Sequence, residues 1–165
     1  MRVMLISPLG YSINKDTRYS GIERLVWLYA QELSKTQDVT VAGRSDSVFN
    51  TNTLPIDVVQ GEDIFQKAEL RHYQSYQSYI RNFDVIHDFS HSHLTARFND
   101  NLPVLSIFWH SPAVARFPKA PYNIIAYSKW AEREFTRIYL QNARYQPTLM
   151  LDTNIYKVSN KHRND

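Results

Sequence analysis

The chain has 165 residues, a formal net charge of +3 and no cysteine, which excludes disulfides, thiol catalysis and a cysteine-based zinc site. Its content of 43% hydrophobic and 21% charged residues is that of one globular domain. No run of residues approaches the ~18 apolar positions of a membrane-spanning helix. We expect a cytoplasmic protein, whose mild positive charge permits contact with phosphates or an anionic membrane surface without requiring either.

The first half of the chain predicts three strands and two helices. The apolar run at residues 2–7 is typical of a strand covered on both faces. Apolar residues recur at helical spacing over residues 21–35 and 62–82. The aromatic stripe of the second helix, from Phe65 to Phe83, is more typical of a core face than of a ligand surface. Further strands are expected at 38–42, ended by Gly43, and at 56–59.

The second half continues this alternation, with strands predicted at residues 84–87, 103–108, 123–127 and 145–151 and helices at 92–98 and 129–140. Ser128 is expected to cap the last helix, because a serine hydroxyl accepts hydrogen bonds from the N–H groups of a first turn. Alternating strands and helices imply right-handed β-α-β units. We therefore predict a three-layer, Rossmann-like α/β domain with a mostly parallel sheet at residues 1–150, followed by a polar, basic tail at 151–165.

Ligands of such sheets bind beyond the carboxyl ends of the strands, and the first loop at that edge leads into Ser20 and Gly21. A glycine at a helix start lets a ligand approach the backbone. The unpaired N–H groups there favour an anion such as a diphosphate. The alternative is that Gly21 only permits a tight turn from the loop into the helix.

The second loop at this edge is rich in histidine, with His87, Asp88, His91 and His93 close together. A metal site would need the imidazoles to converge with the carboxylate, whereas His87 and Asp88, as neighbours on a strand, point to opposite faces. We expect no metal, and a substrate-contacting or loop-ordering role for one or two of the histidines. Purely structural histidines are the alternative.

The third loop begins with Trp109 and His110. A histidine just beyond a strand can donate to an oxygen of a ligand such as a sugar, or act as an acid or base near neutral pH. Trp109 can offer an apolar face to a sugar ring. The alternative is that Pro112 shapes a turn and that Trp109 and His110 pack beneath it.

Lys129, Arg133 and Arg137 form a basic stripe at four-residue spacing on the last predicted helix. A solvated helix face is the usual meaning of such a stripe, and a membrane-facing patch is the sharper alternative. No phosphate-binding Walker loop, zinc-ligand spacing or nucleophile–base order stands out. No array of basic and aromatic residues indicates a nucleic-acid partner.

Five groups of residues, taken in order, resemble the N-terminal domain of family 4 glycosyltransferases, which have the two-domain GT-B fold. They are Met1-Arg-Val-Met-Leu-Ile-Ser-Pro8 with Ser20-Gly-Ile-Glu-Arg-Leu-Val26, Asp84-Val-Ile-His-Asp88 with His91 and His93, Phe108-Trp-His110, Ala126-Tyr-Ser-Lys-Trp130, and Asp152-Thr-Asn-Ile-Tyr156. The chain departs from the family pattern at Ser20, which stands where the first of two glycines is usual. It departs again where Leu149 and Met150 replace an Asn-Gly pair.

The resemblance implies a retaining, metal-independent glycosyltransferase that needs no cofactor. The N-terminal domain of such an enzyme binds a sugar or lipid-linked acceptor, and a second Rossmann-like domain holds the nucleotide sugar. We expect that second domain in a further segment or a partner chain, because Asp152 to Tyr156 resembles the end of the inter-domain linker and the sequence given stops at Asp165.

For the site, the resemblance implies that Gly21, with Ser20, lies beside the donor phosphates and that His110 is catalytic, near the transferred sugar. The further candidate binding residues are His87, His91, His93 and Trp109. Two other functions stay open. One is a stand-alone, non-catalytic module that binds a glycan, a lipid-linked acceptor or a protein, which the departures at Ser20 and at Leu149 and Met150 favour. The other is an unrelated Rossmann-like enzyme that binds a nucleotide of its own.

Overall fold

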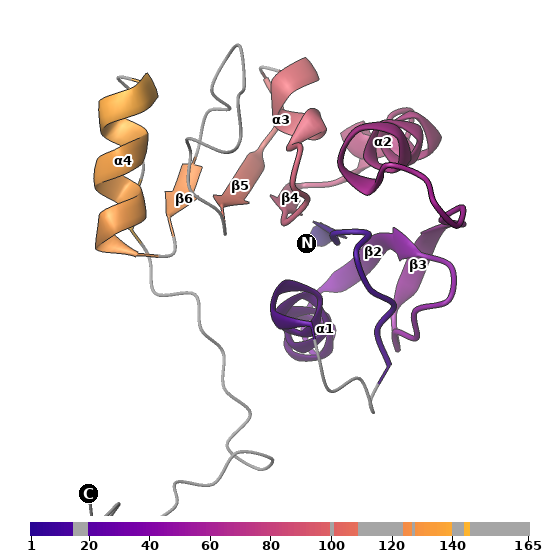
Figure 1. The fold of residues 1–165 in the computed structure, drawn as a ribbon. Helices are drawn as coiled ribbons and strands as arrows, with labels where there is room; N and C mark the ends of the chain where they lie inside the picture. The colour runs from indigo at the N-terminus through magenta and orange to yellow at the C-terminus, as the bar shows by residue number, and fades with distance from the viewer. Residues whose placement is uncertain (15–19, 100, 109–123, 127, 140–143, 146–165) are drawn as a thin grey trace, which may run out of the picture.

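The structure is a computed structural model that describes residues 1–14, 20–99, 101–108, 124–126, 128–139 and 144–145. In these residues the framework is an open sheet of seven strands, all paired in parallel, with the order β3-β2-β1-β4-β5-β6-β7. Figure 1 labels β2 to β6 of this sheet. The strands are β1 (Arg2–Ile6), β2 (Asp38–Arg44), β3 (Asn52–Ile56), β4 (Val85–Asp88), β5 (Val104–Phe108), β6 (Ile124–Ala126) and β7 (Arg144–Tyr145). This is the predicted Rossmann-like α/β fold.

The described helical segments are α1 (Gly21–Leu33), the π-helical turn η1 (Ile64–Ala68), α2 (Glu69–Tyr76), the 3₁₀ turn η2 (Ile80–Asn82), α3 (Leu94–Phe98) and α4 (Lys129–Tyr139). The Ser128 hydroxyl accepts a hydrogen bond from the Ala131 backbone N–H (3.1 Å), which confirms the predicted cap of α4. None of the helices in the described ranges is long and apolar enough to cross a membrane.

The core lies on both faces of the sheet, because consecutive side chains of β1 alternate between them. Val3 and Leu5 pack with α1 residues on one face, while Met4 and Ile6 pack with α2 and α3 residues on the other. All four side chains are at most 1% exposed. The continuous apolar run at the start of the chain is thus the central strand of a three-layer structure, as its composition indicates.

Two predicted strands have different bounds in the structure. Strand β2 continues through Gly43 to Arg44, because parallel pairing with β3 extends past the glycine as far as Arg44↔Ile56. The strand expected at residues 56–59 is instead β3, Asn52–Ile56. Its Pro55 is compatible with this position, since β3 is an edge strand with one unpaired side.

The single helix expected at residues 62–82 is wrong, since this stretch forms the three shorter segments η1, α2 and η2. Among the stripe residues whose side chains the structure describes, Tyr73, Tyr76 and Ile80 are buried and face the core, while the side chain of Phe65 lies outside the description. Tyr79 breaks the predicted pattern and is 51% exposed, because it lies in the turn before η2 rather than on a continuous helix. The last strand begins at Arg144, and the rest of the predicted 145–151 strand, like the tail at 151–165, lies outside the described residues.

Candidate functional site

The point of the sheet at which the strand order reverses lies between β1 and β4. These strands pair in parallel from Val3↔Val85 to Ile6↔Asp88, and the Phe89 N–H continues the ladder by donating to the Ile6 carbonyl (3.0 Å). The chain continues from β1 to α1 and from β4 to α3, and these two helices pack on opposite faces of the sheet (Figure 1). In open α/β sheets, ligands bind at this topological switch point. We call residues 7–14 and 89–93 the switch-point loops.

Helix α1 begins at this edge with Ser20 and Gly21. Ser20 is the N-cap residue, but its hydroxyl makes no capping hydrogen bond, and its oxygen is buried without a partner among the described residues. Gly21 is exposed and lacks a positive φ, and a Cβ atom built on it would meet no described atom within 4 Å. The described structure therefore gives no conformational reason for a glycine, and Gly21 itself is exposed at the helix start.

Glu23, in the first turn of α1, holds the first switch-point loop. Its Oε1 accepts a hydrogen bond from the Tyr11 backbone N–H (3.2 Å) and lies 3.1 Å from where a Cβ on Gly10 would be. From the end of β2, Arg44 donates to the Leu9 carbonyl (3.3 Å). The spacing of residues does not reveal these roles, since Glu23 is compatible with an ordinary polar helix position until the loop is folded against it.

The second switch-point loop follows Asp88, the last residue of β4, whose carboxyl group is completely buried. Asp88 Oδ1 accepts hydrogen bonds from the Ser90 hydroxyl (2.6 Å) and the Ser90 backbone N–H (3.0 Å). Burial raises the pKa of Asp88 from 3.8 to about 7, although the two Ser90 bonds oppose the shift. His93 Nδ1 lies 3.8 Å from Asp88 Oδ1, and His93 has φ 45°, the one positive φ of a described non-glycine residue.

A second buried carboxylate, Glu69 at the start of α2, reaches the same loop. It accepts from the His91 backbone N–H (2.9 Å) and the Ser92 backbone N–H (2.7 Å), and it lies 3.2 Å from His91 Nδ1. The Glu69 side chain is 2% exposed and that of His91 is 16% exposed. His91 is therefore a partly accessible imidazole at the switch point, attached to a buried anchor.

The remaining predicted histidine of this group, His87, faces away from the others. It lies against Tyr29 of α1, with ring centroids 6.1 Å apart, and its burial lowers its pKa. Asp88 faces α2, where it contributes to the raised pKa of the buried Tyr76. The expected opposite orientation of His87 and Asp88 is confirmed. Within the described part of the chain, no group of three or more His, Asp or Glu side chains is placed to hold a metal ion.

The other predicted site residues, Trp109 and His110, lie outside the described residues. Strand β5 leads towards them, and it ends beside β4 at the same edge of the sheet. The basic stripe of α4 is exposed, but two of its three cations have acidic neighbours on the same helix. Lys129 lies 3.2 Å from Glu132, and Arg137 lies 2.7 Å from Glu134.

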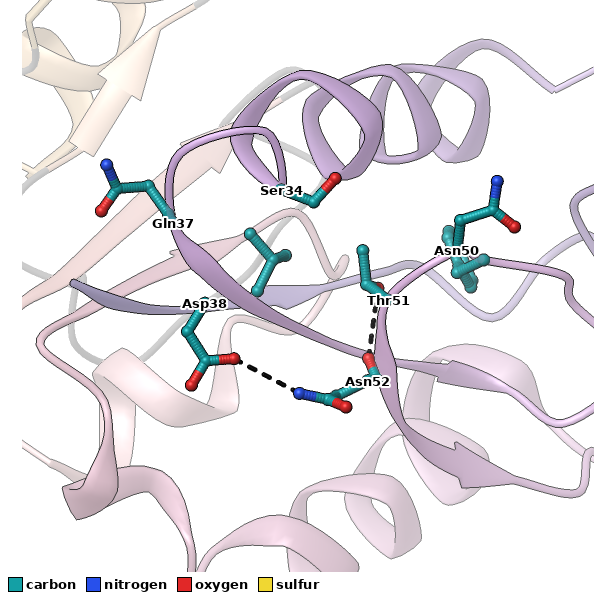
Figure 2. Close-up of a pocket in the computed structure, with 8 residues that line it drawn as sticks. Ser34, Gln37, Asp38, Asn50, Thr51 and Asn52 are labelled. Atoms are coloured by element: carbon teal, nitrogen blue, oxygen red, sulfur yellow. Dashed lines mark hydrogen bonds between the residues drawn. The ribbon is translucent and has the colours of Figure 1, made fainter.

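A shallow hollow of about 440 Å³ lies at the opposite, amino edge of the sheet. Figure 2 shows its polar rim, where Asn52 donates to Asp38 Oδ1 (3.3 Å). The rim residues are Ser34, Gln37, Asp38, Asn50, Thr51 and Asn52, with Val39 and Phe49 beside them. The hollow contains no predicted site residue, and its ionisable group, Asp38, is exposed at the rim, so we place the candidate site at the switch point instead.

The switch point thus combines a helix start at an exposed glycine with a partly exposed histidine on a loop that two buried carboxyl groups hold in place. Such a set can bind an anion through backbone N–H groups and a hydroxyl-bearing ligand through an imidazole. No protein-family model matches the sequence, and a search of curated proteins finds no significant match.

Proposed function

We propose that this chain is the acceptor-binding half of a retaining, metal-independent glycosyltransferase, whose nucleotide-sugar donor is held by a second domain or partner chain. The observation that supports this most directly is that two features lie at the same carboxyl edge of the sheet, where the strand order reverses between β1 and β4. One is the start of α1 at the exposed Gly21, and the other is the anchored His91 loop. Both belong to segments whose sequences resemble those of family 4 glycosyltransferases.

In this proposal the start of α1 and the His91 loop have different tasks. The first turn of α1 offers backbone N–H groups to the donor diphosphate as it leaves, an electrostatic role that strengthens as negative charge develops. The His91 loop contacts hydroxyl groups of a sugar or lipid-linked acceptor. His110 acts as the catalytic residue near the transferred sugar, with Trp109 against a sugar ring.

A second candidate function is a non-catalytic module of the same fold that recognises a glycan, a lipid-linked acceptor or a protein. Ser20 favours it, because its hydroxyl and Cβ occupy a position where the resembling family has a glycine, and that hydroxyl is buried. Substitution of His110 separates the two functions. His110→Ala should abolish sugar transfer by this chain with its donor-binding partner, whereas unchanged transfer would exclude a catalytic role for His110.

Acceptor binding is tested by screening the chain against arrayed glycans and lipid-linked oligosaccharides. We expect a saccharide ligand whose affinity falls roughly tenfold or more in His91→Ala, because a buried or half-buried hydrogen bond to a ligand contributes ~1–2 kcal/mol. Asn50→Ala, at the rim of the hollow on the opposite edge, is the matched control and should bind as the wild type does. Loss of binding in Asn50→Ala but not in His91→Ala would place the ligand at the hollow and contradict the proposal.

A further inference from the structure

The contacts of Glu69 bear on which nitrogen of His91 carries the proton. Glu69 Oε1 accepts from the His91 backbone N–H, and Oε2 accepts from the Ser92 backbone N–H. Both carboxylate oxygens therefore act as acceptors towards this loop. The group 3.2 Å away, His91 Nδ1, is compatible with this arrangement as an N–H donor, since a bare nitrogen there would face an acceptor with its own lone pair.

The ionisable groups around Glu69 are either neutral or directed to other partners, so they do not compete for its carboxylate. Its helical neighbour His72 is buried, and burial lowers the pKa of His72 to about 4, so that side chain is neutral near pH 7 and brings no positive charge to the carboxylate. The buried carboxyl group of Asp88, which interacts electrostatically with Glu69, is directed to Ser90. Arg71 on the same helix pairs with Glu62 at 2.7 Å. The hydrogen bonds described for the Glu69 side chain all go to His91 and Ser92.

We propose that Glu69 is a positioning residue, which holds the loop after β4 and fixes His91 as the Nδ1–H tautomer. In a neutral imidazole the hydrogen bond of one nitrogen decides the state of the other, so His91 Nε2 bears the lone pair. His91 then accepts, rather than donates, when it meets a ligand hydroxyl through Nε2. The use of His91 on an acceptor hydroxyl rests on the proposed function, whereas the tautomer does not.

The tautomer is measured by ¹⁵N NMR of the histidine side chains at a pH about two units above the ordinary histidine pKa of about 6.5, with His91→Asn used to assign the signal. We expect the wild-type ring to carry its proton on Nδ1. In Glu69→Ala the proton should move towards Nε2, and the amides of His91 and Ser92 should exchange roughly tenfold faster or more, since each loses a charged acceptor. Glu62→Gln, which removes a carboxylate paired with Arg71, is the control and should leave His91 unchanged.

A wild-type ring protonated on Nε2 would overturn the proposal, and so would an Nδ1–H ring that persists in Glu69→Ala. Should that variant not fold, the wild-type spectrum and Glu69→Gln, which turns one acceptor oxygen into a donor, still decide the matter. An Nδ1–H ring in a chain that binds no saccharide would contradict the proposed function and leave the role of Glu69 intact. Saccharide binding by a chain with an Nε2–H ring would contradict the role of Glu69 and leave the proposed function intact.

Discussion

Asp88 sits at the end of β4 with its carboxyl group shielded from solvent, and its pKa rises from 3.8 to about 7. A carboxyl group whose pKa is higher in the folded than in the unfolded state stabilises the fold while it is protonated, and this stabilisation is lost once the pH forces it to ionise. Its stabilising contribution is therefore complete below pH ~4, declines as the pH rises towards ~7, and is absent above that. Each unit of such a shift corresponds to about 1.4 kcal/mol.

Asp88→Asn should remove this pH dependence, because an amide of the same shape keeps an oxygen for Ser90 and does not ionise. We expect the free energy of unfolding of the variant, relative to the wild type, to increase by a few kcal/mol between pH 4 and pH 8. Urea unfolding at several pH values measures it. The difference in unfolding free energy is compared, rather than the wild-type value alone, because His72 contributes a pH dependence of the opposite sign in both proteins. The pKa of His72 is lowered to about 4, so its contribution is lost as the pH falls. A difference that stays constant from pH 4 to pH 8 would show that Asp88 ionises normally.

Glu23 is the corresponding anchor of the loop after β1. Glu23→Ala should lower the free energy of unfolding by about 1–3 kcal/mol, because it removes the acceptor of a partly buried N–H group at Tyr11. Glu32→Ala, on the same helix, is the control. Glu32 pairs with Lys35 on an exposed surface, so its loss should cost at most about 1 kcal/mol. Equal effects of the two substitutions, measured by urea unfolding, would contradict the anchoring role of Glu23.

At the scale of elements, the strongest local patterns predicted their own elements correctly. The run from Val3 to Ile6 is the central strand and the hydroxyl of Ser128 caps α4, since both depend on local composition. β3 was misplaced because Ile56 and the valines after it are more apolar than Asn52 to Pro55, whereas pairing with β2 selects the earlier residues. The stretch 62–82 has the predicted aromatic spacing, but its backbone hydrogen bonds switch from π to α to 3₁₀ along its length. Side-chain periodicity does not indicate such a switch.

The candidate site divides in the same way. The positions of Gly21, His91 and Asp88 at one edge of the sheet follow from the strand pattern, because carboxyl ends of parallel strands share an edge. The anchors Glu23 and Glu69 do not follow from it. Each is distant in sequence from the loop it holds, by 12 residues for Tyr11 and 22 for His91, so that only the folded chain brings them together.

Two of the three cations in the basic stripe of α4 are paired with acidic side chains. Lys129 and Arg137 lie close to glutamates one turn away, so they add little attraction to an anionic membrane, where an uncompensated cation is worth ~1 kcal/mol. We expect the wild type and a Lys129→Gln, Arg137→Gln double variant to co-sediment equally with phosphatidylserine vesicles at about 0.15 M salt. Sedimentation of the wild type that the double variant loses would instead assign this face to a membrane.

At the scale of the whole molecule, the strand order and the two loops at its reversal point define one ligand edge. If the chain is the acceptor-binding half of a glycosyltransferase, this edge supplies one wall of a cleft and the donor nucleotide is held mainly by the other. The chain alone should then have a preference between two classes of ligand. It should bind the saccharide acceptor through the switch-point loops, and it should bind a free nucleotide weakly.

Amide-resolved NMR titration of the chain alone tests this most directly, with UDP, GDP and their glucose and mannose conjugates in one series and the saccharide found by array screening in the other. We expect the saccharide to shift the amides of residues 89–93, and each nucleotide to bind with a Kd weaker than about 1 mM, or ~4 kcal/mol. A nucleotide that binds the chain alone with micromolar affinity, about 8 kcal/mol, would contradict this expectation and indicate a Rossmann-like enzyme that holds its own nucleotide.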